Sequence, residues 1–242
     1  MIIKSNKIFF GCVLAAVLLF SSAALAQKTT VDSSQARPAQ TAEEQARASL
    51  HDRIIKVVNL MTARVNAEGA DFNKHLAQMN AAAPLETSHL DSAGLAASVP
   101  LVLEFLQYIK DCRHSSDSLN QAFNDSMFAL NADLPAGEVD ENLKEIDNSF
   151  NEDRAAFSNF LAALDKAYAK VLDALLFLQN AQYTIVKDQL SFNSKKSYTE
   201  YSKLMKSVDA ANVELGKSNE ALRKANAKAN KKVKKQISNS SE

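Results

Sequence analysis

The sequence predicts an all-α protein built as an elongated antiparallel four-helix bundle, and three observations carry this prediction. Apolar residues recur at three- and four-residue steps over most of the chain. Beyond residue 40 the prolines fall only at Pro84, Pro100 and Pro135, and no glycine or proline separates Gly137 from Gly216. Long amphipathic helices are unstable alone in water, so their apolar stripes must pack together. The alternative is a long coiled-coil hairpin that completes its core by dimerising.

The first 26 residues predict a secretory signal peptide. Lys4 and Lys7 precede an apolar run from Ile8 to Leu19, and the segment ends in the small-residue pattern Ala24-Leu25-Ala26. We expect cleavage after this pattern and export to the periplasm or the cell exterior. The alternative is an uncleaved membrane anchor, since the apolar segment is just long enough to cross a bilayer.

The rest of the chain divides into a linker, one domain and a tail. Residues 27–40 have almost no large apolar side chain and contain Pro38, so burial cannot offset the entropy of ordering them. We expect a flexible linker there, one helical domain over residues 41–236, and a disordered tail at 237–242.

Composition narrows the function classes. Basic and acidic residues balance at 28 each, so global charge does not favour a nucleic-acid partner. Only Cys112 remains after processing, so no intramolecular disulfide is available and apolar burial must stabilise the fold.

Two helices are expected before residue 133. The first opens at a capping box formed by Thr41 and Glu44, and the second runs from about Val99 to Ala132. The apolar stripe of the first is Leu50, Ile54, Val57, Met61, Val65, Phe72, Leu76 and Met79. That of the second is Val102, Leu106, Ile109, Cys112, Leu119, Phe123, Met127 and Leu130.

Two further helices are expected after Gly137. The third begins at about Glu138, and its stripe extends from Val139 to Ile185. The fourth opens at a capping box of Ser197 and Glu200, so the break falls near residues 192–197.

Antiparallel order places the acidic start of the third helix beside the basic end of the fourth. We interpret this lysine-rich end as a solvated, partly paired helix terminus. The alternative is a contact for anionic lipid or a cell-wall polymer. Nucleic acid is not favoured, because no aromatic residue alternates with the lysines. The lysines are Lys228, Lys231, Lys232, Lys234 and Lys235.

The opposite end of the predicted rod is apolar and lies beside the longest connection, Pro84 to Ser98. That connection either covers the end as ordinary core or acts as a movable lid over a partner surface. The candidate contact residues are Leu90, Leu95, Leu101, Phe105, Leu176, Phe177 and Tyr183.

Two pairs of potentially reactive residues lie close together in the sequence, but neither predicts a chemical site. Glu86 and His89 have metal-ligand spacing, but a di-metal bundle needs that pair twice. Cys112 lies two residues from His114, and on a helix such side chains point apart. We therefore predict no catalytic, metal or cofactor site. Arg154 interrupts the third stripe, and we predict a buried pair between it and Asp117.

The leading functional hypothesis is a non-enzymatic exported envelope protein. It would act as a scaffold or chaperone-like module that offers helical surfaces and an apolar tip to another protein or envelope component. A homo-oligomer is compatible with this reading. The alternative hypothesis is a bundle that senses or binds a small molecule or lipid between its helices.

Overall fold

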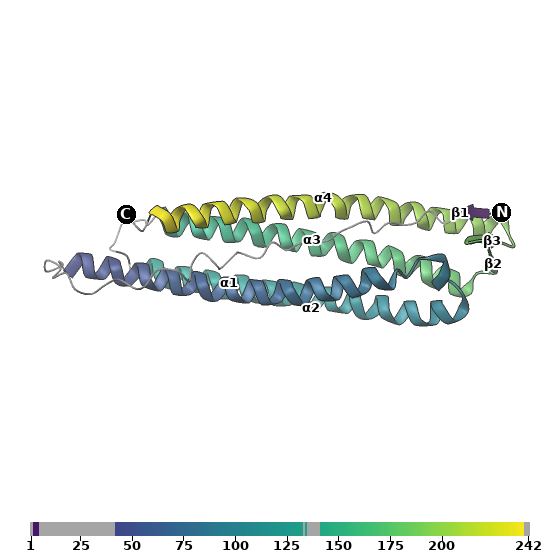
Figure 1. Ribbon diagram of the computed structural model, residues 1–242, viewed down its shortest axis with the longest axis horizontal. Coiled ribbons are helices and arrows are strands. Elements are labelled where there is room, and N and C mark those ends of the chain that lie inside the picture. The colour runs from purple at the N-terminus through teal and green to yellow at the C-terminus, as the bar shows by residue number, and fades with distance from the viewer. Residues whose placement is uncertain (1, 5–41, 133, 135–140, 240–242) are drawn as a thin grey trace.

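Four long helices dominate the structure. The computed structural model describes residues 2–4, 42–132, 134 and 141–239. The helices extend side by side along one long axis (Figure 1). Their bounds are α1 Ala42–Ala82, α2 Ser92–Ala132, α3 Glu141–Asn180 and α4 Lys195–Asn239. The prediction of a mostly helical protein with four helices is therefore confirmed.

A small antiparallel sheet accompanies the four helices. Strands β2 (Tyr183–Val186) and β3 (Gln189–Phe192) form a hairpin, and β1 (Ile2–Lys4) pairs with the other edge of β3. The segment Tyr-Thr-Ile-Val is rich in residues that favour strands. Ile185, assigned above to the third helix, lies in β2, because α3 ends at Asn180 and the chain continues into the hairpin.

Contacts between neighbouring helices have antiparallel register. Lys166 of α3 contacts Glu214 of α4, and moving back along α3 to Glu152 advances the α4 partner to Lys228. Helix α2 packs on both α1 and α3. On the second of these seams, the ring of Phe105 lies 4.8 Å from that of Tyr168, centroid to centroid.

One predicted helix start and one predicted cap were wrong, and local capping explains both. Helix α2 begins seven residues earlier than expected, at Ser92 with Pro100 inside it, because the Asp91 carboxylate accepts the N–H of Gly94 at 2.7 Å. Helix α4 is capped by Ser194, whose Oγ accepts the N–H of Ser197 at 3.0 Å. Both caps stand three residues before the bonded amide.

The core consists of two clusters. The larger lies toward the hairpin and draws on all four helices and β3; the smaller lies toward the other end of the rod and draws on α1, α2 and α3. The members of the smaller cluster are Met61, Val65, Leu119, Phe123, Met127, Leu130, Leu143 and Phe150. Arg154 lies between the two clusters, on α3.

Several sequence-level predictions fall at the ends of the chain. The signal peptide beyond Lys4 and the linker lie outside the described residues. Helix α4 extends to Asn239, so the first part of the predicted tail is helical. Within the described residues, α2 is the one helix long and apolar enough to cross a bilayer, a test that a core helix also passes.

Candidate functional site

The hairpin end of the rod is the candidate site, and we use this name for the region where the α1–α2 connection, the start of α2, the end of α3 and the hairpin meet. Two long-range hydrogen bonds join the connection to the hairpin. The Tyr183 hydroxyl donates to the Leu90 carbonyl, and the Thr87 hydroxyl donates to the Asp188 carbonyl at 3.4 Å. The hairpin and the connection therefore hold each other in place.

The α1–α2 connection is itself part of the core. It holds the short 3-10 helix η2 (Thr87–His89), and its leucines Leu85 and Leu90 are buried at 6% and 2% exposure, as is Leu95 in the first turn of α2 at 4%. Gly94 allows the close approach, because a Cβ there would lie 2.3 Å from the His89 carbonyl oxygen. The connection thus covers the end of the bundle as packed structure.

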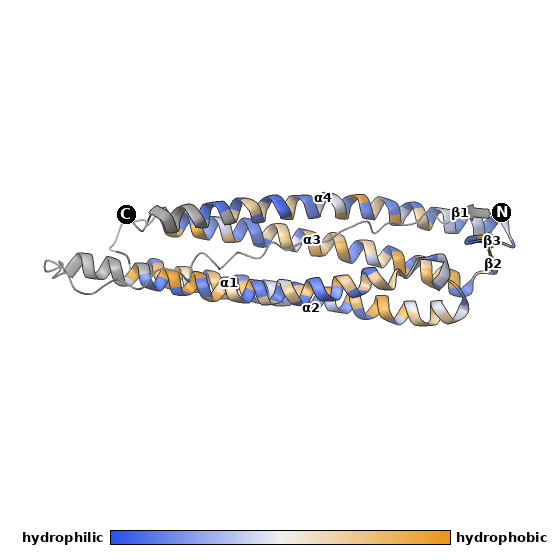
Figure 2. Ribbon diagram, in the orientation of Figure 1, coloured by the Kyte–Doolittle hydropathy of each residue, from blue (hydrophilic) through white to orange (hydrophobic). Residues whose placement is uncertain are grey.

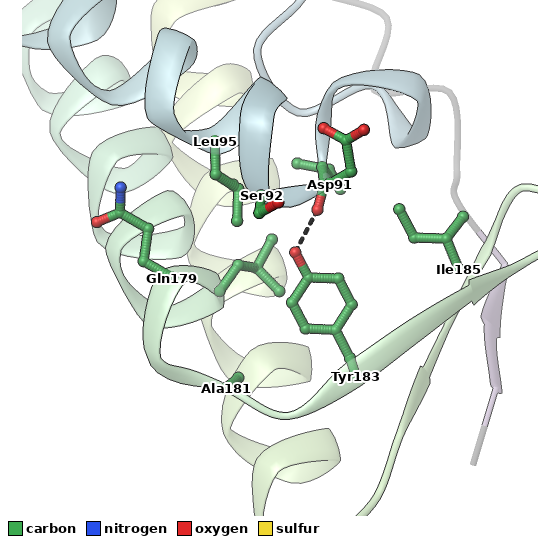
Figure 3. Close-up of a pocket in the computed structure, with 9 residues that line it drawn as sticks. Asp91, Ser92, Leu95, Gln179, Ala181, Tyr183 and Ile185 are labelled. Atoms are coloured by element: carbon green, nitrogen blue, oxygen red, sulfur yellow. Dashed lines mark hydrogen bonds between the residues drawn. The ribbon is translucent and has the colours of Figure 1, made fainter.

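An open pocket of about 490 Å³ lies between the start of α2, the end of α3 and β2 (Figure 3). Its size falls in the range of ordinary ligand pockets. Polar groups from Asp91 and Gln179 stand at its rim among apolar side chains. The lining residues are Leu90, Asp91, Ser92, Leu95, Leu178, Gln179, Ala181, Tyr183 and Ile185.

The structure divides the seven predicted contact residues into three groups. Leu90, Leu95 and Phe105 are buried in the larger cluster. Phe177 is half-buried, and its ring lies 6.2 Å from the ring of Tyr201. Tyr183 is half-buried in β2. Only Leu101 and Leu176 present large exposed apolar surface, at 38% and 41% exposure.

Three exposed apolar residues at the same end were not among the predicted contact residues. They are Leu103, Ile185 and Val186, exposed at 49%, 38% and 53%. Ile185 was assigned to a helical stripe, and only the short Tyr-Thr-Ile-Val segment with Lys187-Asp188 after it signalled a hairpin. Leu103 lies on a helix that is apolar on more than one face.

The first part of α2 contributes to this exposed apolar surface. No charged residue occurs between Asp91 and Glu104, and the apolar colour of this end is visible in Figure 2. Because Phe105 lies level with Tyr168 in an antiparallel pair, Leu101 lies near the level of Leu172 on α3. The exposed apolar residues of this part of α2 are Ala93, Ala96, Ala97, Pro100, Leu101 and Leu103.

At the other end of the rod, the predicted charge pairing occurs at one lysine. The Lys228 ammonium donates to Glu152 at 2.6 Å, and this bond lowers the pKa of the Glu152 carboxyl. Lys231 is exposed and Lys232 is half-buried. The side chains of Lys234 and Lys235 lie outside the described residues.

Arg154 is buried as expected, but its partner is not Asp117, which is exposed. The guanidinium donates to Ser116 Oγ at 3.3 Å and lies 3.7 Å from Glu68 Oε2. It also lies within 5.6 Å of the ring centroids of Phe150 and Phe157, an arrangement that favours a cation. The predicted pair failed because α2 turns Ser116 inward and the next residue outward.

Asp153 is buried beside Arg154. Burial raises the pKa of the Asp153 carboxyl from 3.8 to about 6, and the charge of Arg154 partly opposes this rise. One carboxylate oxygen of Asp153 has no hydrogen-bond partner among the described residues. The layer that contains Asp153 and Arg154 therefore carries an electrostatic cost in the middle of the core.

Polar residues on the α1–α2 seam give no nucleophile. Tyr108 donates to Asp71 at 2.8 Å and stacks on His75, with ring centroids 4.0 Å apart. Burial raises the pKa of the adjacent Cys112 thiol, which disfavours the reactive thiolate. Within the described part of the chain, no group of three or more His, Cys, Asp or Glu residues could hold a metal ion.

Comparison of the chain with protein-family models, with curated proteins and with solved structures found no match. The chemistry of the hairpin end is therefore the basis for any functional assignment.

Proposed function

We propose that the protein is an exported, non-enzymatic interaction module that binds a partner polypeptide or envelope component at its hairpin end. The observation that carries the proposal is that the elements forming this end carry several exposed apolar side chains, one of which, Ile185, lines the open pocket. Leu101, Leu103, Leu176, Ile185 and Val186 are each between 38% and 53% exposed. Exposed apolar surface of this kind marks contact sites more often than isolated leucines do.

The helices provide a scaffold for this end. We infer that they close into an up-down-up-down bundle, in which the long rod separates the hairpin end from the basic end of α4. The antiparallel contacts on all three sequential seams support this arrangement. Export by the secretory route is part of the same proposal and is supported by the composition of residues 1–26.

A second candidate function is binding of a small apolar ligand or lipid, and the pocket volume favours it. The space of about 490 Å³ would hold a compact apolar molecule. The rim groups of Asp91, Ser92 and Gln179 would then orient its polar end.

Site-specific photo-crosslinking tests the proposal. A photoreactive residue replaces Leu176 in one variant and Phe128 in the matched control, because Phe128 is 77% exposed and lies on α2 away from the hairpin. Irradiation of cells, followed by purification from the envelope fraction, should give one discrete adduct from position 176 and none from 128. Equal capture at both positions, or none at 176, would contradict the proposal; a lipid adduct would favour the second candidate.

A further inference from the structure

The hairpin determines which backbone N–H and C=O groups of β3 point away from β2, toward the outer edge of the strand. In a hairpin with a two-residue turn, the residues next to the turn exchange hydrogen bonds across the pair. Gln189 and Ser191 therefore bond toward β2, and the N–H of Asn193 continues the pattern by donating to the Gln182 carbonyl at 3.3 Å. The backbone groups of Leu190 and Phe192 consequently face away from β2.

The β3 edge is held rigidly. Leu190 and Phe192 are each 4% exposed, and the Phe192 ring lies 5.3 Å from the Tyr201 ring of α4. A strand anchored by its own core residues needs little ordering to accept a neighbour, which lowers the entropic cost of pairing. Unpaired strand edges of this kind readily accept an added strand.

The structure identifies the chemistry that this edge accepts. Strand β1 lies antiparallel on it, with Ile2 opposite Ser191, Ile3 opposite Leu190 and Lys4 opposite Gln189. The pairing of Ile3 with Leu190 is the one that uses the outward backbone groups of β3. The occupant is therefore an extended segment with a β-branched aliphatic residue opposite Leu190.

Residues 2–4 belong to the segment expected to be removed on export, and the new N-terminus cannot replace them. Helix α1 has 41 residues and is about 60 Å long. It begins at the end of the rod opposite the hairpin (Figure 1). The roughly 15 residues from the cleavage site to α1 span at most about 54 Å when fully extended, which is too short to reach β3.

We propose that the edge of β3 in the processed protein is a strand-addition site for an extended aliphatic segment of a partner polypeptide. This inference rests on the proposed function and names the class of partner that the hairpin end takes. In the precursor, the chain's own β1 occupies the same edge, so the site becomes available only when the leader is removed. Backbone pairing at Leu190 supplies affinity, and the exposed Ile185 and Val186 of β2 lie one strand away.

The test uses the processed chain purified from the envelope and a synthetic heptapeptide with the sequence of residues 1–7. The Leu190 amide should exchange its hydrogen rapidly in the processed chain alone. Millimolar peptide should slow that exchange by about tenfold or more, because a hydrogen-bonded amide exchanges only when the bond opens. The same peptide with Ile3→Pro, which lacks the required N–H, should have no effect.

Three outcomes would overturn the strand-addition site. These are equal exchange with both peptides, a Leu190 amide already protected in a monomer without peptide, and protection that instead follows dimerisation of the chain. A photoreactive residue at Gln189, compared with the one at Leu176, separates this inference from the broader proposal. Capture at 176 without capture at 189 leaves the proposed function standing and refutes strand addition; capture at neither refutes both.

Discussion

The half of the rod next to the hairpin and the half beyond Arg154 use the same helices but build different cores. The hairpin half combines apolar residues from all four helices with Leu190 and Phe192 of β3. Among the described residues, the apolar cluster of the other half comes from α1, α2 and α3 only. Among the described residues, the hairpin half therefore has the larger apolar cluster, and members of this cluster line the pocket.

The largest expected effect comes from truncating the centre of the hairpin half. Phe160 is 0% exposed and packs edge-on against Phe72 at 5.9 Å between ring centroids. Phe160→Ala should lower the free energy of unfolding by about 3 to 5 kcal/mol, measured by urea denaturation. The matched change Phe123→Ala in the other half should cost less, about 2 to 3 kcal/mol, because a cavity in the smaller cluster relaxes more easily. Equal losses would show that the two halves are equally well packed.

Substitution of Arg154, which lies between the two halves, should have the next largest effect on stability. Arg154→Met keeps the apolar stem but leaves Asp153 and Glu68 without their buried cation. We expect a loss of about 3 kcal/mol at pH 8, since removing one partner of a buried pair leaves an uncompensated charge. An unchanged melting temperature together with an unchanged oligomeric state would mean that the arginine does not stabilise this layer.

The raised pKa of Asp153 in the same layer predicts that the unfolding free energy depends on pH. The pKa of Asp153 is raised to about 6 in the folded protein from 3.8, so the folded state binds the proton more tightly than the unfolded state. The contribution of Asp153 to stability is therefore fully present below about pH 4 and is lost as the pH rises through 6. The unfolding free energy of wild type minus that of Asp153→Asn should fall by about 2 kcal/mol between pH 4 and pH 8. A difference that is flat across this range would contradict the assignment.

A smaller and local effect is expected at the hairpin. Tyr183→Phe removes the hydroxyl that donates to the Leu90 carbonyl and should cost about 1 kcal/mol. Amide exchange should become faster in residues 183–192 and stay unchanged around Phe123 in the other half. Faster exchange in both halves would indicate that the hairpin supports the whole rod.

The sequence was sufficient to predict the four helices but not the residues at which they begin. Heptad-like stripes specify burial, so Phe72, Leu161 and Val208 are core residues in the structure as their spacing predicts. Pro100 was taken as a helix boundary because proline removes a backbone donor. The Asp91 cap and the burial of Leu95 and Val99 outweigh that loss.

The candidate site was predictable only as a region. Apolar density near Leu176 predicted an apolar end of the rod, but periodicity alone cannot distinguish a last helical turn from a short strand at Ile185. The turn between the strands places Lys187 and Asp188 at φ of 51° and 57° without glycine. Its usual Asn-Gly signal is therefore missing.

A surface substitution that spares the fold tests the central claim most directly. Leu176→Lys and the matched control Val213→Lys each place a lysine on an exposed apolar position, at 41% and 59% exposure, and neither should change the unfolding free energy by more than about 0.5 kcal/mol. The measurement is the yield of the adduct captured by a photoreactive residue at Ile185 in the processed protein. We predict that Leu176→Lys abolishes this capture and Val213→Lys preserves it. Equal yields from two equally stable variants would contradict binding at the hairpin end.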